Sequence, residues 1–347
     1  MGISIRAWSG LPFEAVLVWM TVTYATVILF EVCKLRQASG RTLRDALPGV
    51  QGSLASRLFL FAPPSLLWHQ PSSPPLPGWQ SPGETLPLPQ PPLLDLNNVR
   101  VMRGSNVVLH DLTLQIHADE KVAILGPNGC GKSTLVKTIT RECYPVASED
   151  SRMTILGEER WNVFELRSLL GIVSNDLMSF LTTAATGLDV VLSGFFSSAA
   201  VLPHHRVNST QESAARAALA QLEAEQLAER PVCEMSSGEA KRVLIARALV
   251  HAPKTLLFDE PSNSLDFTAH ASLRQSMRSL AASGIGIILV THDLSDIIPE
   301  ITRVLLMRNG QILADGPKEA MLQRGSLSPL FGTQVKIERR DGYFHLW

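Results

Sequence analysis

Residues 126–134 read GPNGCGKST, between an apolar run at Lys121–Leu125 and a helix-compatible stretch at residues 135–141. This is the spacing of a phosphate-binding P-loop, in the strand, loop and helix setting that gives the motif its meaning. Glycines let the backbone turn so tightly that successive N–H groups can surround a phosphate at the positive end of the following helix. The sequence therefore predicts a nucleotide-binding site.

The side chains of this loop add two contacts to its backbone. Lys132 supplies a full positive charge, and the Ser133 hydroxyl is placed to ligate magnesium. We expect the whole loop to contact the nucleotide. Its residues are Gly126, Pro127, Asn128, Gly129, Cys130, Gly131, Lys132, Ser133 and Thr134.

Two acids end a second apolar run further along the chain. Residues 255–261 read TLLFDEP. A buried strand that ends in this way delivers two carboxylates to the edge of a sheet, where one can hold magnesium and the other can polarise water. We assign Asp259 to the metal, directly or through water, and Glu260 to the general base.

A third motif, MSSGE at residues 235–239, precedes a helix-compatible run at residues 240–250. Together with the P-loop it resembles the signature of the ATP-binding cassette (ABC) family, usually written LSGGQ. Met, Ser and Glu replace the family's Leu, first Gly and Gln, whereas Ser236 and Gly238 match. The resemblance implies that Ser236, Ser237 and Gly238 contact a nucleotide phosphate.

Two more motifs follow in the order that the ABC family has. Residues 264–266 (SLD) resemble the D-loop, which crosses a dimer interface, and His292 in LVTHD resembles the switch histidine. The resemblance covers about residues 93–331. It implies ATP and Mg²⁺ as cofactors, Asp266 in the composite nucleotide site, and catalytic roles for Lys132, Glu260 and His292.

The chain departs from the family at two site positions. Asn175 stands where the Q-loop glutamine is usual, and its amide oxygen could still ligate Mg²⁺ from a shorter side chain. Arg103 stands where an aromatic residue usually stacks on adenine. A guanidinium plane can stack on a base, and an ordinary solvated arginine is the equal alternative.

The strand pattern predicts an α/β fold, a P-loop NTPase of ABC type with a mostly parallel core sheet. Residues 94–101 and 112–116 should form an antiparallel edge sheet. Asn309 and Gly310 separate two short strands, a strong hairpin signal. Parallel core strands are expected at residues 122–125, 171–174, 255–258 and 287–290.

A helical subdomain is expected at about residues 177–250, inserted between the Q-loop and the helix that follows the signature. Ser209 and Glu212 have the spacing of a capping box, before an alanine-rich run that continues to Glu229. The ABC resemblance implies a helical subdomain at this place.

The N-terminal part differs in composition from the rest. We divide the chain into an apolar segment at residues 1–36, a Pro/Ser-rich linker at 37–92, the cassette at 93–333 and a C-terminal extension at 334–347. Residues 15–30 carry no charge and are followed by several basic residues, which predicts a membrane anchor whose C-terminal side faces the cytoplasm. A buried or interfacial helix, a targeting peptide and a gene-start error stay open.

Charge and cysteine usage argue against a nucleic-acid partner and against a structural zinc site. The formal net charge is −1, so no chain-wide basic field favours nucleic acid. The four cysteines include no C-x-x-C pair, which argues against a structural zinc site and fits a reducing compartment.

In the family's geometry, a P-loop and a signature serve one nucleotide only when they come from different cassettes. The resemblance therefore implies a dimer, most simply a homodimer, that hydrolyses ATP. Our leading hypothesis is the ATPase subunit of a transporter at the cytoplasmic face of a membrane, with a separate transmembrane permease. A soluble cytoplasmic ATPase that acts on nucleic acid or a ribosome and a poorly hydrolysing regulatory cassette are the alternatives. SSGE, Asn175 and the run at residues 297–312 resemble the molybdate-transport or photorepair subgroup.

Overall fold

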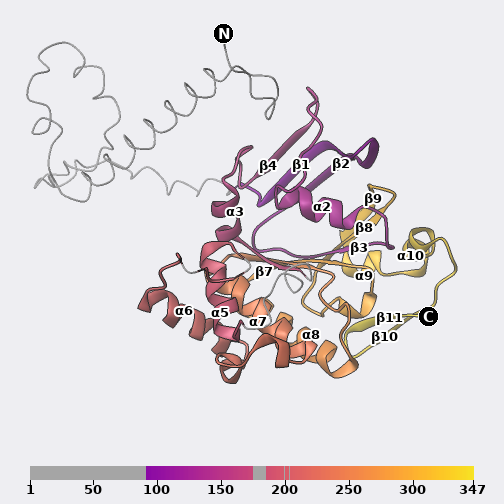
Figure 1. The fold of residues 1–347 in the computed structure, drawn as a ribbon. Helices are drawn as coiled ribbons and strands as arrows, with labels where there is room; N and C mark the ends of the chain where they lie inside the picture. Colours follow the sequence, from indigo (N-terminus) through magenta and orange to yellow (C-terminus); the bar gives the residue numbers. More distant parts are fainter. Residues whose placement is uncertain (1–90, 175–184, 199, 203) are drawn as a thin grey trace, which may run out of the picture. The chain divides into compact units, whose positions relative to one another are not determined.

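The computed structural model describes residues 91–174, 185–198, 200–202 and 204–347, which belong to one compact unit (Figure 1). Its centre is a six-stranded sheet in the order β5-β6-β7-β3-β8-β9. All neighbours in this sheet pair in parallel except β8 and β9, which are antiparallel. The strands are β3 (Lys121–Leu125), β5 (Leu170–Ser174), β6 (Thr255–Asp259), β7 (Gly286–Thr291), β8 (Arg303–Arg308) and β9 (Gln311–Pro317). The predicted parallel strands and the hairpin are confirmed.

A second sheet is antiparallel, in the order β2-β1-β4. Its strands are β1 (Leu94–Arg103), β2 (Asn106–Ile116) and β4 (Arg152–Ile155). From Asp111 to Ile116, exposed and buried residues alternate along β2, as expected where one sheet face is covered. The antiparallel edge sheet is therefore confirmed, while β4 has no counterpart among the expected strands.

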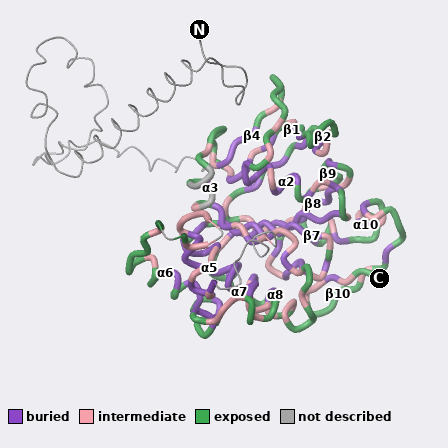
Figure 2. Tube along the Cα trace, in the orientation of Figure 1, coloured by how far each residue is buried: buried purple, intermediate pink, exposed green. Residues whose placement is uncertain are grey.

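The parallel strands of the central sheet are mostly buried (Figure 2). Alternate residues of β3 belong to two different hydrophobic cores. Val122 and Ile124 pack with the antiparallel sheet and α2 (Lys132–Ile139). Ala123 and Leu125 pack with the helices on the opposite side. Figure 1 shows these two layers above and below the central strands. Burial on both sides explains the continuous apolar runs of the parallel strands.

Four helices form the lower layer: α5 (Gly187–Ser193), α6 (Ser209–Ala220), α7 (Ser237–Leu249) and α8 (Phe267–Ala282). The cap of α6 lies one residue before the predicted one, because Asn208 and Gln211 form the capping box in place of Ser209 and Glu212. The helix also ends well before Glu229, since Glu223 has a left-handed φ of 51°. Both predictions about α6 were therefore wrong in position.

The remaining elements are short and connect or cover the main layers. They are α3 (Val163–Leu169), η2 (Gly194–Phe196), η3 (Glu225–Leu227), η4 (Val232–Glu234), η5 (Leu294–Asp296), α9 (Lys318–Met321) and α10 (Arg324–Phe331). The chain ends in a hairpin, β10 (Ile337–Arg340) and β11 (Tyr343–Leu346). Phe344 of this hairpin is buried, and the Arg274 guanidinium of α8 lies 4.4 Å from the Tyr343 ring centre.

Several predictions concern residues outside the described ranges. These are the apolar segment at 1–36, all of the linker but its last two residues, Asn175, and the start of the helical subdomain. Within the described ranges, we find no helix with the length and hydropathy of a membrane span.

The close approach of the β8–β9 hairpin to β2 can be tested through the free energy of unfolding. Gly310 has φ +75°, and a Cβ there would lie 2.0 Å from the Val108 carbonyl oxygen, whereas Gly104 has φ +61° with open space around it. We expect Gly104→Ala to lower the free energy of unfolding by about 1 kcal/mol, the cost of a left-handed alanine. Gly310→Ala should cost a further ~1–3 kcal/mol for the overlap. Urea unfolding of the two variants measures the difference, and equal losses would contradict the close approach.

Candidate active site

The P-loop connects β3 to α2 and is held by neighbouring strands. Gly129 and Gly131 have left-handed φ angles of 77° and 108°, which only glycine adopts readily. The Gly126 N–H donates to the Thr291 carbonyl at 3.3 Å, and the Gly310 N–H donates to the Cys130 carbonyl at 2.7 Å. The end of β7 and the β8–β9 hairpin therefore fix the loop against the sheet.

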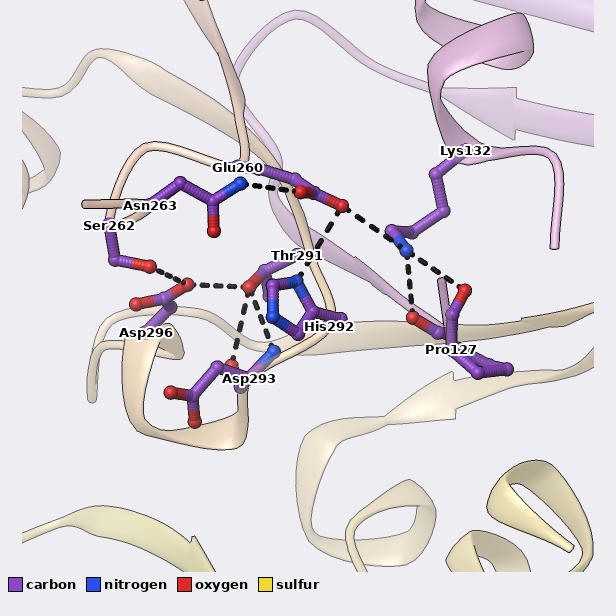
Figure 3. Close-up of polar contacts among 10 residues, drawn as sticks. Pro127, Lys132, Glu260, Ser262, Asn263, Thr291, His292, Asp293 and Asp296 are labelled. Carbon is purple, nitrogen blue, oxygen red and sulfur yellow. Dashed lines mark hydrogen bonds and ion pairs between the residues drawn. The ribbon is translucent and has the colours of Figure 1, made fainter. Parts of the chain in front are cut away.

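Lys132 is buried inside this loop, with 4% of its side chain exposed. Its ammonium donates to the carbonyl oxygens of Gly126 at 2.8 Å and Pro127 at 3.0 Å, and lies 3.3 Å from the Glu260 carboxylate (Figure 3). The P-loop lysine and the predicted general base thus form an ion pair. Because a buried charge needs compensation, a phosphate that enters the loop would compete with these oxygens for the lysine.

Glu260 lies at the centre of the predicted catalytic residues. Its carboxylate accepts a hydrogen bond from the Asn263 amide at 2.7 Å and lies 3.6 Å from Nδ1 of His292 (Figure 3). Its backbone has an unusual left-handed φ of 43°, and its N–H donates to the Val290 carbonyl at 2.8 Å. The structure therefore brings Lys132, Glu260 and His292 together around one carboxylate.

The surroundings of Glu260 keep it ionised. Burial raises its pKa, but the Asn263 hydrogen bond and the charges of Lys132 and His292 outweigh this effect, so the net pKa is lowered. A carboxylate that is charged at neutral pH can accept a hydrogen bond from a water molecule. The arrangement can thus orient water for attack on a phosphate.

The P-loop offers further groups at its exposed end. Ser133 and Asn128 are exposed, while Thr134 is buried. The Ser133 hydroxyl and the Asp259 carboxylate at the end of β6 are hard oxygen ligands of the kind that Mg²⁺ prefers. Burial raises the pKa of the Cys130 thiol, against a smaller opposing effect of Lys132, so the thiol stays neutral and acts as a small filler.

Asn175 lies outside the described residues. In the sequence it follows Ser174, the last residue of β5 and the register partner of Asp259. Arg103 is exposed at the end of β1, where it pairs in register with Asn106 of β2.

The signature forms the N-terminus of α7, with Ser236 as the N-cap. The Ser236 hydroxyl accepts from the Glu239 N–H at 3.2 Å, and the Glu239 carboxylate accepts from the Ser236 N–H at 2.8 Å. Glu239 also pairs with Arg230 at 3.0 Å. The glutamate that replaces the family's glutamine is therefore the acid of a capping box.

The signature and the P-loop of one chain are not joined. Among the described residues, no hydrogen bond or ion pair connects Ser236, Ser237 or Gly238 to the loop, and both serines are exposed. Asp266 is likewise exposed and caps α8 by accepting from the Ala269 N–H at 2.7 Å. The signature and the D-loop implied by the resemblance thus present polar groups to the surface.

Sequence reasoning missed two polar residues of the site, Asn263 and Asp296. Asn263 bonds the carboxylate of Glu260 directly. Asp296 is fully buried, and its carboxylate contacts the side chains of Ser262, His270 and Thr291. Neither belongs to a short motif with fixed spacing, so no local pattern marked them.

Comparisons with known proteins agree with this geometry. The ABC transporter family model matches residues 109–263. The ABC transporter ATP-binding protein YlmA of Bacillus subtilis is 30% identical over 250 residues, which cover 71% of this chain and 93% of YlmA.

Solved structures of cassettes share the fold. CbiO1 from Clostridium perfringens, part of the ABC transporter complex CbiONQ, has 25% identity and a TM-score of 0.59, over 69% of this chain and 94% of CbiO1. The dimeric cassette MJ0796 in a post-hydrolysis state, bound to ADP and Pi, has 25% identity and a TM-score of 0.53, over 65% of this chain and 98% of MJ0796. The fold is thus that of known cassettes, and the chain belongs to the ATP-binding cassette family as an ATPase with a nucleotide-binding cassette of the ABC-transporter type.

Proposed function

We propose that two copies of this chain hold ATP between the P-loop of one copy and the signature of the other, and that ATP-driven closure drives a separate membrane permease. One observation carries the proposal: Ser236 and Ser237 are exposed at the start of α7, and among the described residues no hydrogen bond joins them to the P-loop of their own chain. The dimeric state of MJ0796 supports the arrangement. The naming of YlmA as a transporter protein and of CbiO1 as part of a transporter complex supports the permease.

Nucleotide binding begins with an exchange of partners at Lys132. Its ammonium now holds Glu260 at 3.3 Å, together with two loop carbonyls. The triphosphate supplies stronger negative charge at the same place, so the lysine turns toward it and Glu260 is released to orient water. The loop N–H groups and the Ser133 hydroxyl complete the phosphate cradle.

The remaining site residues complete the reaction. Ser133 and Asp259, with Asn175, would hold Mg²⁺, which neutralises charge on the phosphates when bound. His292 contacts the γ-phosphate from the end of β7, and Ser237 and Gly238 of the second copy close over it. Hydrolysis removes the γ-phosphate that joins the two copies, and the dimer opens.

The place of action follows from this function. A cassette that drives a permease works at the cytoplasmic face of a membrane, where ATP is available. The predicted anchor at residues 1–36 would tether the chain there, and the proline-rich linker would give the cassette room to reach its permease.

Glu260→Gln tests the dimer. Loss of the carboxylate should lower kcat roughly 10²–10⁴-fold, while the P-loop and the signature stay intact. The variant should therefore accumulate as an ATP-bound dimer in size-exclusion chromatography with Mg²⁺-ATP. Lys132→Ala in the same background should remain monomeric, because it removes the phosphate contact. Intact hydrolysis by a variant that is only monomeric would refute the scheme.

Arg103 tests the adenine contact. If its guanidinium stacks on the base, Arg103→Ala should raise KM for ATP about two- to fivefold, the equivalent of ~0.5–1 kcal/mol for an exposed cation–π contact. Arg103→Tyr should restore the wild-type KM, because a ring stacks in the same way. A KM unchanged in the alanine variant would assign Arg103 to the solvated surface.

The permease is tested by purification of the full-length chain from its native membrane. We expect a protein with several membrane spans to co-purify in a stoichiometric amount, and to be retained by the Glu260→Gln variant. Recovery of the chain with ribosomes or nucleic acid in place of a membrane protein would favour a non-transport ATPase.

A further inference from the structure

A buried polar cluster lies behind the catalytic residues and connects three segments of the chain. It consists of Ser262, His270, Thr291 and Asp296, and we call it the Asp296 cluster. Asp296 ends η5, Thr291 ends β7, and His270 belongs to the first half of α8. Ser262 lies two residues after Glu260 in the loop between β6 and α8.

The Asp296 carboxylate makes all the bonds of this cluster. It is fully buried, and its Oδ2 accepts from the Ser262 hydroxyl at 2.8 Å and from the Thr291 hydroxyl (Figure 3). Its Oδ1 lies 2.8 Å from Nε2 of His270. The Thr291 hydroxyl also accepts from the Asp293 N–H at 3.0 Å, and of its two acceptors the Asp296 carboxylate is much closer than the Asp293 carbonyl oxygen, which lies 3.5 Å away. A buried carboxylate is stable only with such partners, and it therefore holds the three segments in fixed positions.

Two of these segments carry the proposed catalytic side chains. Thr291 immediately precedes His292, and Ser262 belongs to the same turn as Glu260. This turn is unusual, because Glu260 and Ser264 have left-handed φ angles of 43° and 67°. Backbone in this region persists when surrounding contacts hold it, and the Ser262 bond is one such contact.

The third segment is the N-terminal turn of α8, which follows the D-loop, the predicted dimer contact. His270 is one helical turn beyond Asp266, the N-cap of α8, and its N–H donates to the carbonyl oxygen of Asp266. Gly238 of the signature approaches the same turn, since a Cβ on it would lie 2.8 Å from the Cβ of Ala269. One carboxylate thus contacts a residue in the turn of Glu260, the residue that precedes His292 and the first turn of α8.

We propose that Asp296 is a positioning residue for ATP hydrolysis. It sets the separation between Glu260 and His292, now 3.6 Å, and fixes both to the N-terminal turn of α8. The proposal rests on the function proposed above for Glu260 and His292. Asp296 itself touches neither of their side chains; it acts through Ser262, Thr291 and His270.

Asp296→Asn is the first test, in the full-length chain with steady-state ATP hydrolysis. The substitution keeps the shape but removes the negative charge, and its single acceptor oxygen cannot serve both sides of the carboxylate, because an NH₂ donor then faces either His270 or the Ser262 and Thr291 hydroxyls. We expect kcat to fall about tenfold or more, in the range of a misplaced catalytic group. KM for ATP should stay within about twofold, because the P-loop contacts of Lys132 are untouched.

Glu300→Gln is the matched control. Glu300 follows η5 and pairs with Arg278 of α8 at 2.8 Å, so it also links this segment to α8. In the part of the chain that the structure describes, no hydrogen bond or ion pair joins its side chain to the loops of Glu260 and His292. Its kcat should equal that of wild type even if its unfolding midpoint falls. A purely structural Asp296 would behave like Glu300, with lower stability and unchanged kcat, and this result would overturn the proposal.

A second pair of variants tests the proposal even if Asp296→Asn does not fold. Thr291→Ser keeps the hydroxyl and should retain kcat, whereas Thr291→Val keeps the shape without the hydroxyl and should lose it. Equal kcat values in the two variants would overturn the proposal. Failure of the proposed function is recognised separately, because Glu260→Gln would then hydrolyse ATP like the wild-type chain.

Discussion

The buried ammonium of Lys132 requires negative or polar oxygen partners in every state of the protein. Here it has the carbonyl oxygens of Gly126 and Pro127 and the carboxylate of Glu260. The same charge lowers the pKa of Glu260 against the effect of its burial. Lys132 and Glu260, the proposed phosphate contact and general base, are therefore coupled electrostatically in the nucleotide-free chain. In the proposed function, a triphosphate that binds the lysine also releases the carboxylate.

Strand order explains how residues far apart in the sequence reach this lysine. β6, β7 and β3 are neighbours in the central sheet and run in parallel, so their carboxyl ends meet at one edge. The acids follow β6, His292 follows β7 and the P-loop follows β3. Two hydrophobic cores, one on each face of the sheet, hold these strands in register.

Short motifs predicted most of the residues that the structure brings together, because each motif is local and its spacing is fixed by its chemistry. The P-loop, Glu260 and His292 lie together as expected, and the hairpin at Asn309 is present. Prediction from the sequence failed in two situations. In one, two neighbouring residues offered equivalent capping signals; in the other, no local sequence signal existed. Asn208 and Ser209 both begin a capping pattern, and the structure uses the earlier one. β4 is only four residues long and pairs with distant β1, and Asp296 acquires its partners from three segments that meet only in the folded chain.

The signature of this chain carries a negative charge, that of Glu239, close to the place where a nucleotide phosphate is expected. The contacts of Glu239 explain how this charge is tolerated. A glutamate at the start of α7 would repel the phosphate held by a second copy if its charge were uncompensated. Glu239 instead bonds the Ser236 N–H and pairs with Arg230, and the hydrogen bond from Ser236 is the largest effect that lowers its pKa. The Ser236 hydroxyl accepts from the Glu239 N–H, and its side-chain hydrogen bond with the Glu239 carboxylate is a second effect that lowers the pKa of this glutamate. The capping box therefore directs the glutamate back into its own chain and compensates its charge there.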